Sequence, residues 1–150
     1  MAGNGSSGYL DGPSSIAQFK NPQDMCDDGF GNVYVADSNN YRIRLININT
    51  NIGLLFYFSN NYHLSPFFIQ SKLKKIIFFP VSTFAGNGTN GIIDGPALNA
   101  EFHGPSAILC QPSISTIFVS DSYYLRKIQN GLFKSILFFF IQYIFHSIYF

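Results

Sequence analysis

Hydrophobic positions in the first third of the chain come in short runs that polar turn residues separate. Residues 22–26 and 33–36 are two β-prone runs on either side of a loop rich in Asp and Gly, a pattern that predicts a hairpin. Residues 42–48 alternate polar and apolar side chains, as a half-buried strand does, and residues 81–84 form a fourth short run. No helical period occurs in this unit, so the pattern predicts four short antiparallel strands.

The same pattern occurs twice. The loop that precedes the first strand contains Gly3, Gly5, Asp11 and Gly12, and it returns 83 residues later, from Gly86 onward. The second unit predicts strands at 105–110, 116–120 and 124–128, with a fourth strand either missing or supplied by residues 132–138. Repeated units of this kind bury their apolar faces by stacking on one another.

Four short antiparallel strands in each repeated unit are typical of a β-propeller blade. A propeller ring closes with about four to eight blades, and this chain carries only two repeats. The expected fold is therefore all-β: a propeller fragment of about two four-stranded blades.

Two segments differ from the rest of the chain in composition. Residues 54–80 and 132–150 hold 12 of the 17 Phe but none of the 13 Gly. We divide the chain into a first blade at 2–53, an apolar insertion at 54–80, a linker strand with the second blade at 81–131, and an apolar tail at 132–150. The two segments are either non-native sequence, such as a translated intron and a read-through, or a genuine insertion and tail. The tail falls just short of the about 20 apolar residues of a membrane helix, so membrane contact is expected only if it is genuine.

Charge and cysteine content narrow the classes of function. The formal net charge is +1, and this positive charge comes from the lysines of the two apolar segments. The repeats themselves carry a net negative charge, so nucleic acid is not an expected partner. Cys26 and Cys110 lie in apolar strand-like runs without the spacing of a zinc site or a redox pair, and we expect buried free thiols. No secretory signal is visible at the N-terminus, and the sequence does not predict a compartment.

Residues that recur in both units are expected to serve the fold. Asp37 and Asp121 are each followed by an arginine, and a carboxylate there can cap its turn and pair with that arginine. The recurring residues are Gly3, Gly5, Asp11, Gly12, Asp37, Arg44, Gly86, Gly88, Asp94, Gly95, Asp121 and Arg126.

No cofactor, metal or catalytic residue is predicted. Asp27, Asp28 and Asn32 form an oxygen-rich cluster, but their spacing differs from that of a calcium-binding EF-hand loop. The glycine loops lack the strand and helix of a phosphate site. Outside the two apolar segments the only histidine is His103, which cannot build a channel metal site alone.

With these elements in order, the chain resembles the NHL repeat family of β-propellers. The resemblance rests on residues 31–40, GNVYVADSNN, on the Arg-Ile that follows at 42–43, and on the Ala-Gly-x-Gly…Asp-Gly loops. It covers about 2–53 and 81–131, and the second copy departs from it at 111–115 and at Tyr123 and Tyr124.

The resemblance implies a six-bladed propeller that serves as a recognition module, because most members of the family bind proteins. We therefore expect a non-catalytic module that binds a protein through its loops. Two alternatives are a fragment of a metal-dependent propeller enzyme and a fragment of a membrane-tethered sensor ectodomain. The candidate binding residues lie in two intact loops: Asp27, Asp28, Asn32, Asn39, Asn40, Tyr41 and Arg42.

Overall fold

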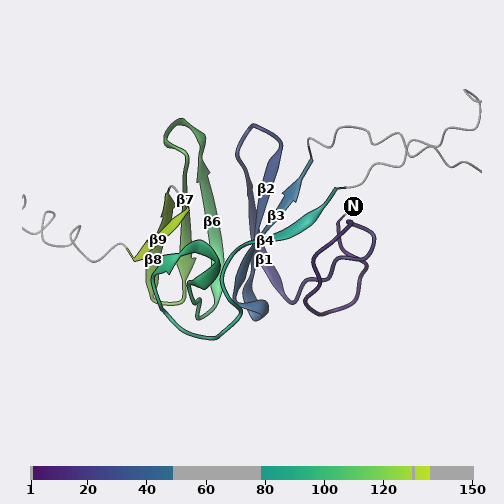
Figure 1. The fold of residues 1–150 in the computed structure, drawn as a ribbon, viewed down its shortest axis with the longest axis horizontal. Helices are drawn as coiled ribbons and strands as arrows, with labels where there is room; N and C mark the ends of the chain where they lie inside the picture. Colours follow the sequence, from purple (N-terminus) through teal and green to yellow (C-terminus); the bar gives the residue numbers. More distant parts are fainter. Residues whose placement is uncertain (1, 49–78, 130, 136–150) are drawn as a thin grey trace, which may run out of the picture.

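The described residues form two antiparallel β-sheets. The structure, a computed structural model, describes residues 2–48, 79–129 and 131–135 of the 150-residue chain. Within these residues the strand orders are β1-β2-β3-β4 and β5-β9-β8-β7-β6 (Figure 1). β1 to β4 form one meander and β6 to β9 form another, and β5 joins the second sheet beside β9. The all-β class is confirmed, and the arrangement fits a propeller fragment of two blades.

The first sheet follows the alternation of the sequence closely. A short 3-10 turn, Ser38–Asn40, connects its second and third strands, and Tyr41 ends that turn in the left-handed conformation. The strands are β1 (Pro22–Asp27), β2 (Asn32–Asp37), β3 (Arg42–Asn47) and β4 (Val81–Ala85).

The second sheet repeats this arrangement and adds one short strand. Its fourth long strand, β9, contains residues of the segment 132–138, one of the two alternatives that the sequence left open. β5 pairs with β9 at the edge of the sheet. The strands are β5 (Gly95–Pro96), β6 (Pro105–Gln111), β7 (Thr116–Asp121), β8 (Tyr124–Gln129) and β9 (Leu132–Ser135); 3-10 turns lie at Ala97–Asn99 and Pro112–Ile114.

The predictions for the two apolar segments fall mostly outside the described residues. Only residues 79–80 of the insertion and 132–135 of the tail are described. Among the residues that are described, no helix has the length and apolar character needed to cross a membrane.

The two sheets pack face to face around one hydrophobic core. β1 and β6, the first long strands of each sheet, lie side by side (Figure 1). Each sheet thus buries one face against the other, as stacked sheets do. The buried residues of this core are Tyr34, Ala36, Ile43, Ala85, Ala100, Phe102, Ile108, Ile117, Val119 and Ile128.

Each sheet also contains a fully buried arginine between two aspartates. Arg44 Nη1 lies 2.8 Å from Asp37 Oδ2, and Arg44 Nη2 lies 2.6 Å from Asp11 Oδ1. The second sheet repeats this with Arg126, which lies 3.0 Å from Asp121 and 2.8 Å from Asp94. The expected aspartate–arginine contacts are therefore present in both units.

The aspartate of β2 holds a more distant segment than expected. Asp37 makes no side-chain cap to the backbone of the turn that follows it, although its Oδ2 atom accepts a hydrogen bond of 2.8 Å from Asn40 Nδ2 in that turn. Its Oδ1 atom accepts a hydrogen bond of 2.8 Å from the backbone N–H of Lys20. Asp121 does the same for the N–H groups of His103 and Gly104. These carboxylates therefore fasten the segment before the first long strand to the sheet.

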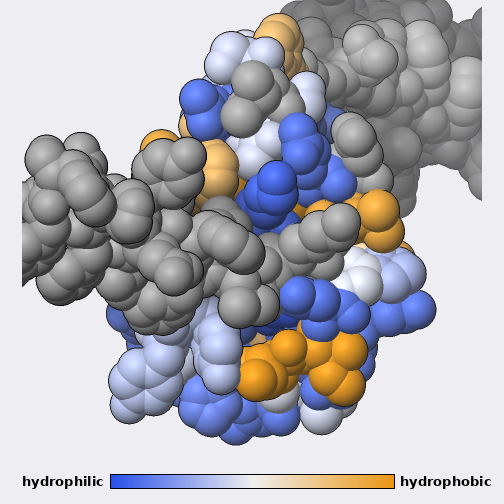
Figure 2. Space-filling model, turned by 90° about the vertical axis from the view of Figure 1, so that its left-hand side faces the viewer, coloured by the Kyte–Doolittle hydropathy of each residue, from blue (hydrophilic) through white to orange (hydrophobic). Residues whose placement is uncertain are grey.

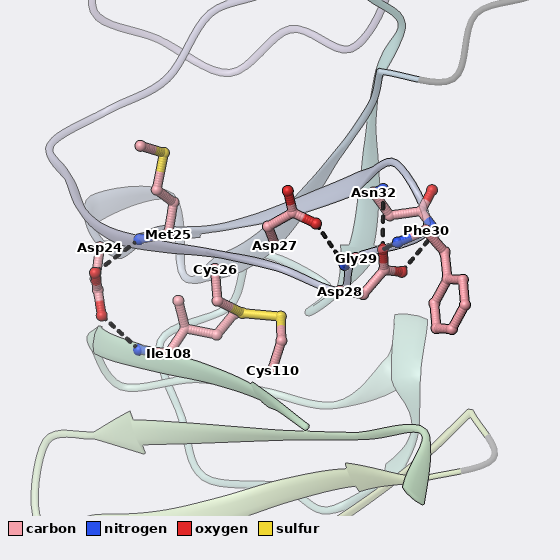
Figure 3. The surroundings of a disulfide bond; sticks show 10 residues. All are labelled: Asp24, Met25, Cys26, Asp27, Asp28, Gly29, Phe30, Asn32, Ile108 and Cys110. Atoms are coloured by element: carbon pink, nitrogen blue, oxygen red, sulfur yellow. Dashed lines mark hydrogen bonds between the residues drawn. A yellow bond between two sulfur atoms is a disulfide. The ribbon is translucent and has the colours of Figure 1, made fainter. Parts of the chain in front are cut away.

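The expectation of free thiols is wrong, because Cys26 and Cys110 form a disulfide. Their Cα atoms lie 5.6 Å apart, and the two side chains point toward one another from β1 and β6 (Figure 3). The strand pairings make Met25 equivalent to Ile108. Cys26 follows Met25 by one position, whereas Cys110 follows Ile108 by two. Successive side chains of a strand alternate between faces, so this offset turns the two sulfurs toward each other across the sheets.

Replacing Asp37 with alanine is expected to destabilise the protein by about 3 kcal/mol, because Arg44 keeps its buried charge and loses one counter-charge. Urea unfolding followed by circular dichroism measures this change. The control is Lys20→Ala, an exposed side chain whose loss should change the free energy of unfolding by no more than about 0.5 kcal/mol. Equal stability of the two variants would contradict the structural role of Asp37.

Loss of the disulfide is expected to lower the free energy of unfolding by about 2–4 kcal/mol, because the bond closes a long loop with a sequence separation of 84. The double variant Cys26→Ser with Cys110→Ser should unfold at lower urea than the oxidised protein. Adding a reductant should destabilise the wild type and leave the double variant unchanged. Detection of two reactive thiols in the native, unreduced protein would show that the bond is absent.

Candidate binding site between the two sheets

A pocket of about 230 Å³ lies between the two sheets. The first sheet lines it from the β1–β2 loop and from β2 and β4, and the second sheet lines it from the end of β6, the following turn and the start of β7. The lining residues that matter chemically are Asp28, Phe30, Tyr34, Phe84, Ser115 and Thr116. The pocket is therefore a product of the packing of the two repeats.

The β1–β2 loop is held by its own hydrogen bonds. Asp28 Oδ1 accepts from the backbone N–H groups of Phe30 at 2.8 Å and Asn32 at 3.1 Å, and its Oδ2 accepts from Asn32 Nδ2 at 2.7 Å. Asp27 Oδ1 accepts from the N–H of Gly29 at 2.5 Å. This network gives the loop one conformation and presents Phe30, whose side chain is 69% exposed (Figure 3).

The surroundings of the pocket lower the pKa of the Asp28 carboxyl and raise the pKa of the Tyr34 phenol. Burial raises the pKa of Asp28, but the hydrogen bonds from Asn32 and from the backbone outweigh it and hold the pKa below the usual 3.8. Burial raises the pKa of Tyr34 above 10.0, and the charge of Asp28 together with a hydrogen bond to it adds to this effect. At neutral pH the pocket thus holds an ionised carboxylate beside a neutral phenol.

Aromatic rings form the wall of the pocket on the side of the first sheet. Tyr34 and Phe84 meet edge to face, with ring centroids 4.7 Å apart and an interplanar angle of 69°. Phe30 lines the same pocket from the loop. Aromatic faces beside a carboxylate favour a cationic or amphipathic side chain, since both groups attract positive charge.

The second predicted loop lies at the other end of β2. Asn40 is buried and donates to Gly8 O and to Asp37, both at 2.8 Å. Arg42 donates to Asn87 O at 2.7 Å and lies over the ring of Tyr9, 3.9 Å from its centroid. The side chains of this loop are therefore engaged in holding neighbouring segments, with Tyr41 packed against the core and Asn39 exposed.

The structure does not bring the two predicted loops together. Of the predicted binding residues, Asp28 lines the pocket. Sequence reasoning missed Phe30, Tyr34, Phe84 and the 111–116 segment. One signal was present, because Phe30 is an aromatic residue between two glycines in an otherwise polar loop. The 111–116 segment carried no such signal, since it departs from the repeat pattern.

Within residues 2–48, 79–129 and 131–135, no group of three or more His, Cys, Asp or Glu side chains is placed to hold a metal ion. The oxygens of Asp27 and Asp28 instead accept hydrogen bonds from their own loop.

Comparison with known proteins supports the architecture. No family model and no curated protein matches the chain. Among solved structures, the chain is similar to an auxiliary nutrient binding protein from Bacteroides thetaiotaomicron, with a TM-score of 0.50 and 22% sequence identity. The match covers 78% of this chain and 24% of that one, so the chain spans about a quarter of that protein's length. At this identity the likeness shows the fold alone.

The Asp28 carboxylate is expected to stabilise the folded loop only while it is ionised. Because its folded pKa lies below 3.8, this stabilisation is fully present above the unfolded pKa and is lost as the pH falls through the folded pKa. Asp28→Asn should therefore lower the free energy of unfolding by about 1 kcal/mol at pH 7, and the difference should shrink below pH 3.8. Urea unfolding of both proteins between pH 2 and pH 7 measures it, and a difference that stays constant with pH would contradict this account.

Proposed function

We propose that the chain is part of an NHL-type β-propeller and acts as a non-catalytic binding module for a protein partner. The observation that carries this proposal is the pocket between the two sheets, with a rigid loop at its rim, an aromatic wall and an ionised carboxylate. Concave sites with mostly apolar walls and a few fixed polar groups are the usual form of binding sites.

The chemistry of the pocket favours a peptide segment with a basic side chain. The methylenes of a lysine or arginine can lie on Phe30 and Tyr34 while the charged end meets Asp28. The hydroxyl of Ser115, which is exposed on the opposite wall, can bond the backbone of such a peptide. The carboxylate of Asp28 in the pocket wall disfavours a phosphate backbone, which supports a protein rather than a nucleic acid.

The disulfide favours one further candidate, a segment of a sensor ectodomain. Disulfides persist in oxidising compartments and are rare where cellular thiols stay reduced. The Cys26–Cys110 bond joins the two sheets beside the pocket, because Cys110 also lines it. The binding module would then face an extracellular or periplasmic space, and its ligand would come from there.

Selection of a random peptide library on the immobilised chain tests the proposed function. The wild type should enrich peptides that carry Lys or Arg next to an apolar residue, and calorimetry should give their affinity. Phe30→Ala should weaken these peptides about tenfold, as loss of a central aromatic contact does. Asp28→Lys should remove the preference for basic residues.

Tyr123→Ala is the matched control, because this aromatic side chain is also exposed but lies in the β7–β8 turn, away from the pocket. It should bind the selected peptides like the wild type. Failure to enrich any peptide family, or equal binding by Phe30→Ala and the wild type, would refute a peptide site in the pocket.

A further inference from the structure

Because the two sheets are repeats, the exposure of a residue in one sheet can be compared with that of the equivalent residue in the other. Ile43 and Leu125 are equivalent, because each precedes the buried arginine of its strand and pairs with the second strand at the same step. Ile43 is 0% exposed under the second sheet, whereas Leu125 is 52% exposed. Leu109, which stands where the first sheet has Cys26, is 61% exposed. In the first sheet this face is covered by the second sheet. The equivalent face of the second sheet is exposed at Leu109 and Leu125.

Figure 2 is a space-filling view from the side of β6–β9. Hydrophobic residues gather there in separate patches between polar ones. The large apolar residues of β6, β8 and the β7–β8 turn that are exposed are Leu109, Tyr123, Tyr124 and Leu125. Tyr124 precedes Leu125 on β8 and therefore points to the other face of the sheet. We call Leu109, Leu125 and the turn residue Tyr123 the trailing face.

The N-terminal segment lies on the side of the first sheet that faces away from the second sheet (Figure 1). Met25 is 68% exposed, whereas its equivalent Ile108 is 7% exposed against the first sheet. Phe102 is fully buried, whereas its equivalent Phe19 is only partly buried. We call Met25, Phe19 and the 3–8 loop the leading face.

The 3–8 loop of the leading face has the same backbone conformation at Gly3 as the equivalent loop at Gly86, which packs on the first sheet. Gly3 and Gly86 have φ angles of +101° and +96°, and both donate an N–H to an equivalent carbonyl, Ser14 O and Ala97 O. At Gly86 an added Cβ would lie 2.5 Å from Tyr41 O, because the loop packs against the turn of the first sheet. At Gly3 the nearest atom of the described residues is 3.4 Å away, in the ring of Phe19, and neither described sheet approaches it.

We propose that the trailing face of one copy of the chain binds the leading face of a second copy, head to tail. The chain itself supplies the reference for this interface, since its second repeat packs on its first through the same two surfaces. Such a contact is heterologous and adds copies in one direction until a ring closes. With about four to eight blades in a propeller, the ring would hold about two to four copies.

The contacts predicted between copies are mostly apolar, although Lys127 and Ser120 stand on the trailing face where the first sheet has Leu45 and Ala36. Leu125 and Leu109 of one copy would cover Met25 and Phe19 of the next, as the equivalent residues do within the chain. The turn at Tyr123 would lie over Gly3, whose missing side chain leaves the room that Gly86 provides within the chain.

Two bonds that join the sheets within the chain have no equivalent between copies. Leu109 replaces Cys26 and Asp27 replaces Cys110, so no disulfide can form there. Asp24 accepts a hydrogen bond of 2.9 Å from the N–H of Ile108 within the chain, and Ala107 stands in its place on the trailing face. The contact between copies is therefore reversible and depends on concentration.

Sedimentation velocity of the full 150-residue chain without reductant tests the proposal. The wild type should form a species of about two to four times 16.8 kDa, with a share that rises with concentration. Leu125→Asp destroys only the trailing face and Met25→Asp only the leading face, so each variant alone should sediment at 16.8 kDa. An equimolar mixture should form a 1:1 dimer, because each variant keeps the face that the other lacks.

The mixture also shows that both variants are folded, which separates loss of binding from loss of structure. Phe30→Asp is the control for charge on an exposed apolar residue, and it should assemble like the wild type while its pocket is altered. A wild type that stays monomeric at 100 µM, as it would if a blade of another protein covers these faces, overturns the proposal. So does association of either single variant, or a mixture that remains monomeric.

Discussion

Each repeat depends on one fully buried arginine and the groups that neutralise it. Arg44 meets Asp37 of β2 and Asp11 of the preceding loop, and it also donates to Leu10 O and Gln18 O, both at 2.9 Å. A guanidinium without such partners would be very costly to bury. The sheet and the loop before it therefore form one unit, since neither can keep the arginine satisfied alone.

This constraint also joins one repeat to the next. Arg126 holds the 93–101 segment through Asp94 and backbone carbonyls, and that segment carries Phe102 into the core between the sheets. The guanidinium of Arg126 lies 4.9 Å from the centroid of the Phe102 ring. The same group that closes the second sheet thus positions the residue that packs it on the first.

The sequence predicted what depends on local alternation and turn chemistry, and less of what depends on contacts between repeats. The strands follow from period two and from glycine-bearing turns, and the pairing of Asp37 with Arg44 follows from recurrence. The Cys26–Cys110 bond was missed although the sequence contains the offset that predicts it: a separation of 84 against a repeat of 83 puts the thiols on facing surfaces. The pocket could not be predicted although the strand that carries Phe84 was, because its other wall is the 110–117 segment of the second sheet and forms only when the two sheets pack together.

The interface between the two sheets of one chain is stronger than the proposed interface between copies. Ligand binding in the pocket therefore does not depend on association of the chains. Within the chain, a disulfide and the Asp24–Ile108 bond fix the two sheets, so the pocket is formed before any ligand or second copy arrives. Between copies, mostly apolar contact without a disulfide would hold the trailing and leading faces. A reversible ring would then carry one rigid pocket per chain, and a partner with several basic segments would bind it more tightly than any single pocket allows, through effective concentration rather than new contacts.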